Sequence, residues 1–140
     1  MLAYTGAPRN SGTNNWEITK RHIDGDAFIF DCFERIRDTA VALRSALERR
    51  DWDEVGRQIA REWDNRKQLA PGVTTSVIDD LVARATAAGA TAAKVCGAGG
   101  GGCLFCYGPP AARQAIAGAL AEGGSRLLDF RIESEGLRFG

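Results

Sequence analysis

Residues 92–107 read Ala-Ala-Lys-Val-Cys-Gly-Ala-Gly-Gly-Gly-Gly-Cys-Leu-Phe-Cys-Tyr. Two short apolar stretches, 92–96 and 103–107, flank a loop that holds five glycines in six positions. Short apolar runs bounded by glycines are typical of neighbouring strands. The stretch therefore predicts a strand, a glycine loop and a second strand, in a chain whose other segments have helical spacing.

Short strands are also predicted at 2–5 and 128–133, where the last segment alternates apolar and polar residues. Apolar spacing and helix-capping residues predict helices over 14–23, from Asp26 to about 49, over 51–69, 76–88 and 111–122. With the extra helices set aside, the order is β, α, β, β, α, β. This predicts an α+β, ferredoxin-like (split βαβ) fold, with an antiparallel sheet and extra helices inserted after the first strand.

The helix that starts after Asp26 carries one apolar stripe with spacings of four and three residues. Its members are Ile29, Phe33, Ile36, Ala40, Leu43 and Leu47. We expect the larger members, Ile29, Phe33, Ile36, Leu43 and Leu47, to be buried. The charged residues between them are expected on the solvated faces.

Composition limits the classes of function. The chain has 140 residues, which suits one domain over 1–140, and its 18 basic residues balance 18 acidic ones. A neutral chain lacks the charge of a nucleic-acid binder, so any anion must be held by a few placed groups. The sequence shows no signal peptide and no apolar run of the ~20 residues that cross a membrane, so we expect a cytoplasmic protein.

Cys103 and Cys106 have the spacing of a metal-binding pair. They lie in an apolar strand, where an odd offset puts the two sulfurs on opposite faces. No second pair and no neighbouring His completes a tetrahedral set. We therefore expect buried, reduced thiols and no metal.

The glycine loop fits neither common nucleotide motif. A P-loop needs a Lys after its glycines and then a helix, whereas here Lys94 precedes the glycines and a strand follows. Glycines can be needed because something approaches the backbone closely, or because bare amides bind an anion as a nest. A loose hairpin turn is the alternative, and composition alone does not decide between them.

Residues 94–103, Lys-Val-Cys-Gly-Ala-Gly-Gly-Gly-Gly-Cys, closely resemble the third, C-terminal motif of the GHMP kinases. Further stretches are similar to the branch of that family that acts on D-glycero-D-manno-heptose phosphate. They are residues 4–17, 20–26, 65–67 and 71–75. The resemblance extends over nearly the whole chain.

The resemblance implies the C-terminal domain of an ATP-dependent sugar kinase, which transfers the γ-phosphate to a hydroxyl of a sugar or sugar phosphate, here a heptose phosphate. The family's N-terminal domain is absent, and with it the loop that wraps the ATP phosphates, the catalytic Asp and the Mg²⁺-binding Ser and Glu. ATP and Mg²⁺ would therefore serve the complete kinase without being held by this chain alone. We expect the chain to be inactive without that partner domain and to contain no catalytic residue.

The same resemblance suggests site residues. The glycine loop, Gly97, Ala98, Gly99, Gly100, Gly101 and Gly102, would face the ATP phosphate site. Arg9 suits a substrate phosphate, and Ser11, Thr13 and Asn14 suit sugar hydroxyls, unless these residues only cap the next helix. A second set of anion-contact candidates is Lys20, Arg21, Arg66 and Lys67, for which a plain surface charge is the alternative. His22, the only His, has no visible partner and is expected to be structural.

Two other functions remain open at this point. Ferredoxin-like domains also occur as stand-alone modules that bind small ligands or form homodimers through their sheets. An inactive product of gene truncation would have the same sequence features. An upstream reading frame that encodes the missing phosphate loop would favour the kinase.

Overall fold

The computed structural model describes residues 1–8 and 11–137, and only the backbone of residues 11–14. The strands are β1 (Leu2–Tyr4), β2 (Ala92–Val95), β3 (Cys103–Tyr107) and β4 (Arg126–Leu128). The α-helices are α1 (Ser11–Ile23), α2 (Ala27–Arg49), α3 (Trp52–Arg66), α4 (Ser76–Ala87) and α5 (Arg113–Glu122). A short 3₁₀ turn, Pro110–Ala112, precedes α5.

The four strands form one antiparallel sheet in the order β2-β3-β1-β4. Leu2 on the central strand β1 is opposite Phe105 on one side and Leu128 on the other. Helices α1 to α4 all lie between β1 and β2 in the sequence. The predicted α+β fold with a split βαβ sheet and helices inserted after the first strand is confirmed.

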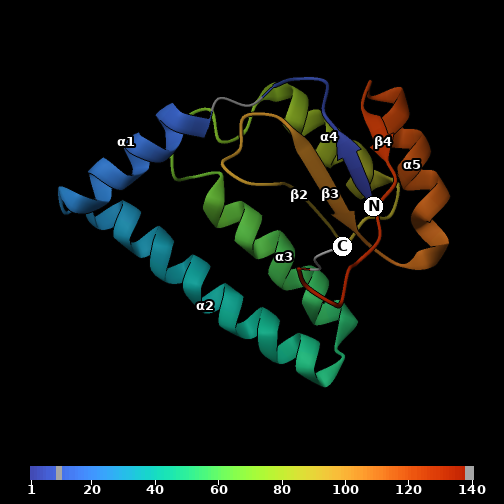
Figure 1. Cartoon of the computed structure of the whole chain (residues 1–140), viewed down its shortest axis with the longest axis horizontal. Helices are drawn as coiled ribbons and strands as arrows, with labels where there is room; N and C mark the ends of the chain where they lie inside the picture. The colour runs from blue at the N-terminus through green and yellow to red at the C-terminus, as the bar shows by residue number, and fades with distance from the viewer. Residues whose placement is uncertain (9–10, 138–140) are drawn as a thin grey trace.

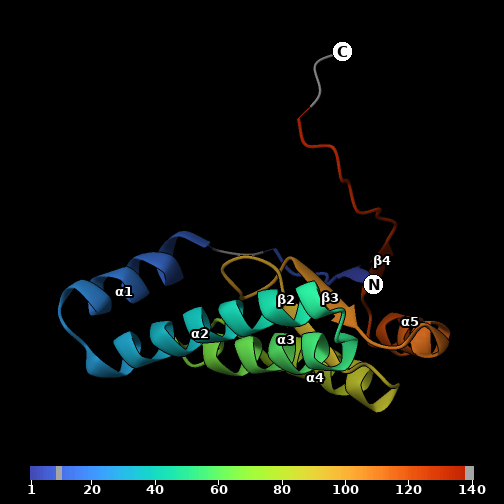
Figure 2. The ribbon, with the colours of Figure 1, turned by 90° about the horizontal axis from the view of Figure 1, so that it is seen from below.

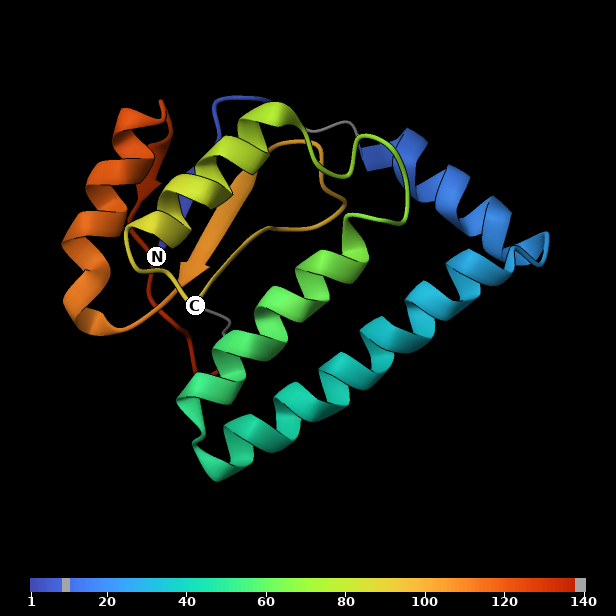
Figure 3. The same ribbon diagram turned by 180° about the vertical axis from the view of Figure 1, so that it is seen from behind.

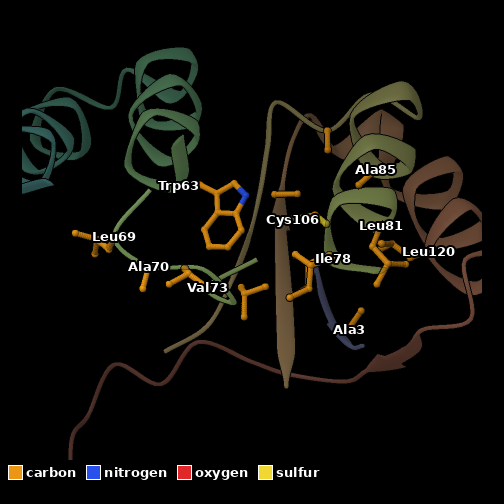
Figure 4. Close-up of a cluster of buried hydrophobic side chains, with 14 of the residues drawn as sticks. Ala3, Trp63, Leu69, Ala70, Val73, Ile78, Leu81, Ala85, Cys106 and Leu120 are labelled. Atoms are coloured by element: carbon orange, nitrogen blue, oxygen red, sulfur yellow. The ribbon is translucent and has the colours of Figure 1, made fainter. Parts of the chain in front are cut away.

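Helices α4 and α5 cover one face of this sheet (Figures 1 and 3). Their buried residues Ile78, Leu81 and Leu120 meet Val95 and Leu104 from the sheet, and all five are 0–1% exposed. Figure 4 shows this cluster, with Trp63 and Val73 closing the side nearest α3. The main core therefore lies between the sheet and helices α4 and α5, with α3 closing one side.

Helices α2 and α3 form an antiparallel hairpin that lies along the β2 edge of the sheet (Figure 3). Each begins at a predicted capping residue, because the Asp26 carboxylate accepts the Phe28 and Ile29 N–H groups and the Asp51 carboxylate accepts the Glu54 N–H. A second apolar cluster joins the hairpin to the sheet: Ala46, Val55, Ile59 and Ala92. This hairpin extends the structure sideways from the sheet.

The buried side of α2 differs from the predicted stripe. Ile29 is fully buried, and Phe33, Ile36 and Leu43 are half-buried, but Leu47 is 47% exposed. The fully or nearly fully buried positions of α2 are Ile29, Cys32, Thr39 and Ala46. The prediction was wrong for Leu47, because the smaller Ala46 is the side chain that faces α3.

Other boundaries moved by a few residues. Helix α1 begins at Ser11 instead of 14, and α3 ends at Arg66 instead of 69. Helix α4 begins at Ser76, as predicted, with Thr75 as its N-cap, and Ile78 lies in the core whereas Val77 is exposed. The last strand is Arg126–Leu128, whereas the prediction placed it at 128–133, a segment that lies outside the sheet after Leu128 and is almost entirely exposed.

The face of the sheet opposite α4 and α5 carries Leu2, Tyr4 and Phe105, all half-buried. Residues 129–137 leave the sheet on this side and extend away from the helices (Figure 2). None of the helices in the described part of the chain is both long enough and apolar enough to cross a membrane.

Candidate functional site

The glycine loop adopts a backbone that few other residues could follow. Gly97, Gly99, Gly100 and Gly102 have φ angles of +80°, +88°, +77° and +80°. Side chains rarely adopt this region, because the Cβ atom collides with the neighbouring carbonyl. The loop between β2 and β3 is therefore a specific conformation that needs its glycines.

Two other segments of the chain hold this loop in place. The Gly100 N–H donates to the Val73 carbonyl at 2.9 Å, and the Gly102 N–H donates to the Ala7 carbonyl at 2.8 Å. A Cβ atom on Gly99 would lie 2.3 Å from the Val73 oxygen. A Cβ atom on Gly101 would lie 2.7 Å from the Ala7 oxygen.

This geometry narrows the alternatives for the loop. Other groups do come close to the backbone of the glycine loop. At Gly99 and Gly101 these groups are backbone carbonyls of this same chain. The amides of Gly100 and Gly102 are already hydrogen-bonded, so an anion nest would have to use the other amides of the loop. The loose-hairpin interpretation does not fit, because the loop is packed against residues 7–8 and 73.

A cleft of ≈ 610 Å³ opens next to the start of this loop. It is lined by side chains and backbone from helix α1, helix α3, the sheet and the loop itself: Asn15, Arg66, Lys94, Val95, Cys96, Gly97, Ala98 and Phe105. The first turn of α1 lies beside the loop end of β2 and β3 in two perpendicular views (Figures 1 and 2). The cleft thus joins segments that are far apart in the sequence.

The charged group at this cleft is a cluster of three side chains. Glu62 on α3 forms ion pairs with Lys94 on β2 and with Arg66 one helical turn along, the latter at 2.5 Å. The side chains of Glu62, Lys94 and Arg66 are 13%, 16% and 32% exposed. One carboxylate shared by two cations leaves the cluster with one net positive charge.

The strand pattern explains why Lys94 reaches the cleft. Ala93 and Val95 point into the core beneath α4, so the alternation of β2 turns Lys94 to the opposite face. In the sequence, Lys94 stands out only for its place before the glycines, and Glu62 is not among the predicted site residues. The Glu62–Arg66 spacing of four residues was the available signal.

The substrate-binding candidates near the N-terminus can be placed only in part. Arg9 lies outside the described residues. Ser11, Thr13 and Asn14 lie in the first turns of α1, but their side chains are outside the described part. Asn15, the next residue, lines the cleft, so the start of α1 borders the site.

Of the second set of anion-contact candidates, the structure brings only Arg66 to the cleft. Lys20 pairs with Asp24 at 2.5 Å, and this hydrogen bond raises the pKa of Lys20. Arg21 pairs with Asp26 at 2.7 Å, and the hydrogen bond from Arg21 lowers the pKa of that carboxyl. Lys67 pairs with Asp64 at 2.7 Å. These three cations stabilise helix ends away from the cleft lining.

His22 packs between two aromatic rings of α2. It stacks on Phe30 with ring centroids 5.5 Å apart and meets the edge of Phe33 at 5.0 Å. Both contacts join α1 to α2. This packing supports the structural role expected for His22.

The two cysteines of the predicted pair do lie on opposite faces. Cys106 points into the core and is 5% exposed, whereas Cys103 is half-buried on the other face. Burial raises the pKa of the Cys106 thiol from 9.0 to about 11. Among residues 1–8 and 11–137, no three His, Cys, Asp or Glu side chains come close enough to hold a metal ion.

The sequence and the fold are similar to known proteins. The family model described as GHMP kinases C terminal matches residues 43–126. The mevalonate kinase of Pyrococcus abyssi (strain GE5 / Orsay) is 42% identical over 69 residues, which are 49% of this chain and 20% of that protein. The D-glycero-alpha-D-manno-heptose 7-phosphate kinase of Campylobacter jejuni is 25% identical over 138 residues, 99% of this chain and 40% of that protein.

Among solved structures, a Lin0012 protein from Listeria innocua superposes with a TM-score of 0.85. The match covers 93% of this chain and 38% of that one at 18% identity, which is a likeness of fold. The chain spans between a fifth and two fifths of the length of the two curated relatives.

Proposed function

The chain belongs to the GHMP kinases, as their C-terminal domain, and we propose that it is one part of an ATP-dependent sugar kinase. The complete kinase transfers the γ-phosphate of ATP to a hydroxyl of a sugar or sugar phosphate. A heptose phosphate is the proposed acceptor. The support for it is a similarity to the heptose 7-phosphate kinase over 99% of the chain, against 49% for the mevalonate kinase.

The observation that carries this proposal is the cleft beside the glycine loop. It is positively charged, it opens to solvent, and its walls include the motif that the sequence shares with the family. In phosphoryl transfer the protein mainly positions two anionic reactants and balances their charge. A positive cleft next to a rigid glycine loop suits the acceptor side of that reaction.

We assign ATP, Mg²⁺ and the general base to the N-terminal domain of the family, which lies outside these 140 residues. In the described residues Glu62 is occupied by two cations, and no carboxylate cluster suits a metal ion. In the proposed step, the acceptor oxygen bonds to the γ-phosphorus, the bond to the β-phosphate oxygen breaks, and the hydroxyl proton leaves to the partner domain's base. This chain contributes the acceptor cleft and the part of the glycine loop that lines it, Gly97 and Ala98.

The test joins this chain to an N-terminal domain. The corresponding domain of the Campylobacter jejuni heptose 7-phosphate kinase is fused ahead of residue 1, and ATP consumption is measured with heptose 7-phosphate, mevalonate and other sugars. We expect turnover with heptose 7-phosphate from the fusion. We expect none from this chain alone or from the N-terminal domain alone.

Turnover by this chain alone, after rigorous removal of host kinases, would overturn the assignment of the catalytic groups to another domain. A folded fusion that phosphorylates none of the acceptors would favour the stand-alone binding module. Turnover with mevalonate and not with heptose 7-phosphate would keep the kinase and overturn the acceptor.

A further inference from the structure

The cluster of Glu62, Lys94 and Arg66 has an excess of one positive charge at a partly buried place. A structural ion pair needs one cation for each carboxylate. Here both cations contact the same carboxylate, and the Nε and Nη2 atoms of Arg66 both lie 2.5 Å from Glu62 Oε1. A net positive charge on partly buried side chains that face a cleft favours the binding of a further anion there.

Glu62 does not accept hydrogen bonds from all the N–H donors of Arg66 and Lys94. A guanidinium has five N–H donors and an ammonium has three, and Glu62 can satisfy only part of them. Arg66 and Lys94 both line the cleft, together with Asn15 on α1. Gly97 and Ala98 form the neighbouring wall, and their small size leaves room beside the cations.

We propose that Lys94 and Arg66, held in position by Glu62, form a subsite for an oxyanion carried by the acceptor substrate. This inference rests on the proposed function and specifies the acceptor class: a hydroxylated molecule with a phosphate or carboxylate away from the hydroxyl that is phosphorylated. The acceptors named for the two relatives fit that class, because heptose 7-phosphate carries a phosphate and mevalonate a carboxylate. Arg66 supplies directed N–H donors to the anion, and Lys94 supplies a compact charge.

Glu62 has a distinct role in this subsite. It fixes the two cations in the cleft and reduces their charge from two to one. A carboxylate in that position limits the affinity for any small anion, so that inorganic phosphate binds weakly and the rest of the acceptor adds the remaining binding energy. Removing the carboxylate should therefore strengthen binding of a free anion.

The experiment measures anion binding to this chain alone, without ATP and without a second domain. Inorganic phosphate and acetate are titrated separately into the protein at low ionic strength, and amide shifts in NMR spectra report Kd and location. We expect the shifts to centre on residues 94–98 and 66. Two variants remove a cation, Lys94→Met and Arg66→Gln, and each should weaken phosphate binding at least about tenfold, ~1.4 kcal/mol.

Three further variants separate binding from folding. Lys94→Arg keeps the charge and should keep most of the affinity. Glu62→Gln should bind phosphate more tightly than the unmodified chain, although it removes two ion pairs. Lys67→Met, at the end of the same helix but paired with Asp64 away from the cleft lining, is the matched control and should bind as before. Thermal unfolding of each variant reports on its fold.

Each outcome either supports or refutes the anion subsite. The subsite is refuted if neither anion binds near residues 94–98, if the cation variants bind as well as the control, or if Glu62→Gln binds more weakly while still folded. Binding of phosphate but not acetate assigns the acceptor's anion as a phosphate, and the reverse assigns a carboxylate. A failed kinase assay with intact anion binding would reject the proposed function alone.

Discussion

Gly99 illustrates at the scale of one residue how much of the glycine loop could be predicted. The run of glycines indicated that something comes close to the backbone. The approaching group could not be identified from the sequence, because the Val73 carbonyl reaches Gly99 only after helices α1 to α3 have folded back. Composition therefore predicts the loop, whereas its contact with the Val73 carbonyl is evident only from the structure.

Substitution of Gly99 by Ala should destabilise this chain strongly. The residue has φ +88°, and the added methyl would lie 2.3 Å from the Val73 carbonyl oxygen. This oxygen belongs to the backbone and cannot rotate away as the end of a flexible side chain could. We expect a loss of about 3 kcal/mol in the free energy of unfolding, roughly 10 °C in Tm.

Gly118→Ala is the matched control. Gly118 lies inside α5 with ordinary backbone angles and open space around its Cβ position, so this change should stabilise the protein by about 1 kcal/mol. Equal Tm values for the two variants would contradict the packing of Gly99 against Val73.

Cys106 gives a prediction on pH. Its burial raises the pKa of the folded thiol from 9.0 to about 11, so the folded state holds the proton more tightly than the unfolded state does. The stabilisation this provides is complete below pH 9 and is lost as the pH rises from 9 to about 11. Urea unfolding of the wild type and of Cys106→Ala over that range should show a steeper decline for the wild type. Parallel curves would contradict it.

At the scale of the element, α2 shows why apolar spacing does not define a buried face. The series Ile29, Phe33, Ile36, Ala40, Leu43, Leu47 and the series Ile29, Cys32, Ile36, Thr39, Leu43, Ala46 both have helical spacing. Hydrophobicity favours the first series. Packing against α3 selects part of the second, because small residues such as Ala46 let two helices approach closely.

A pair of neighbouring substitutions on α2 tests this choice of face. Ala46→Leu inserts three carbons into a fully buried position and should cost about 1–3 kcal/mol. Leu47→Ala removes a side chain that is 47% exposed and should cost about 0.5 kcal/mol. Chemical denaturation of the two variants measures both values, and a larger loss at Leu47 would restore the face predicted from sequence.

The predicted position of strand β4, residues 128–133, was wrong because the length of the neighbouring strand limits pairing. The alternation of residues 128–133 is typical of a strand, but a strand can pair only along the length of its neighbour. Its neighbour β1 has three residues, so pairing is limited to Tyr4–Arg126, Ala3–Leu127 and Leu2–Leu128. The sequence of residues 128–133 contains no information on that limit.

For the whole molecule, the topology was predictable because it depends on the order of elements, which local patterns reveal. The cleft was not, because Asn15, Arg66 and Lys94 come from three elements that only tertiary packing brings together. Of the charged residues at the cleft, Arg66 was predicted from the sequence as an anion contact, because it lies in residues 65–67, which resemble the family. Lys94 and Glu62 required the structure.

The exposed end of the chain offers a test at this scale. Deletion of residues 131–140 should change Tm by less than about 2 °C, because Ile132 is 89% and Leu137 84% exposed. Deletion of residues 126–140 removes β4 and uncovers one edge of β1, and should lower Tm by more than about 5 °C. Differential scanning calorimetry of both truncations distinguishes them, and equal losses would show that residues 131–140 contribute contacts to the fold.

The central place of β1 in the sheet has a consequence for synthesis on the ribosome. β1 precedes helices α1 to α5 in this sequence, whereas its partners β3 and β4 follow only at residues 103–107 and 126–128. The α2–α3 hairpin has mainly local contacts and can form early, whereas pairing of such distant strands is slow. Until both partners have left the ribosome, β1 lacks its neighbours in the sheet, and its open edges are accessible to chaperones and to pairing with another copy.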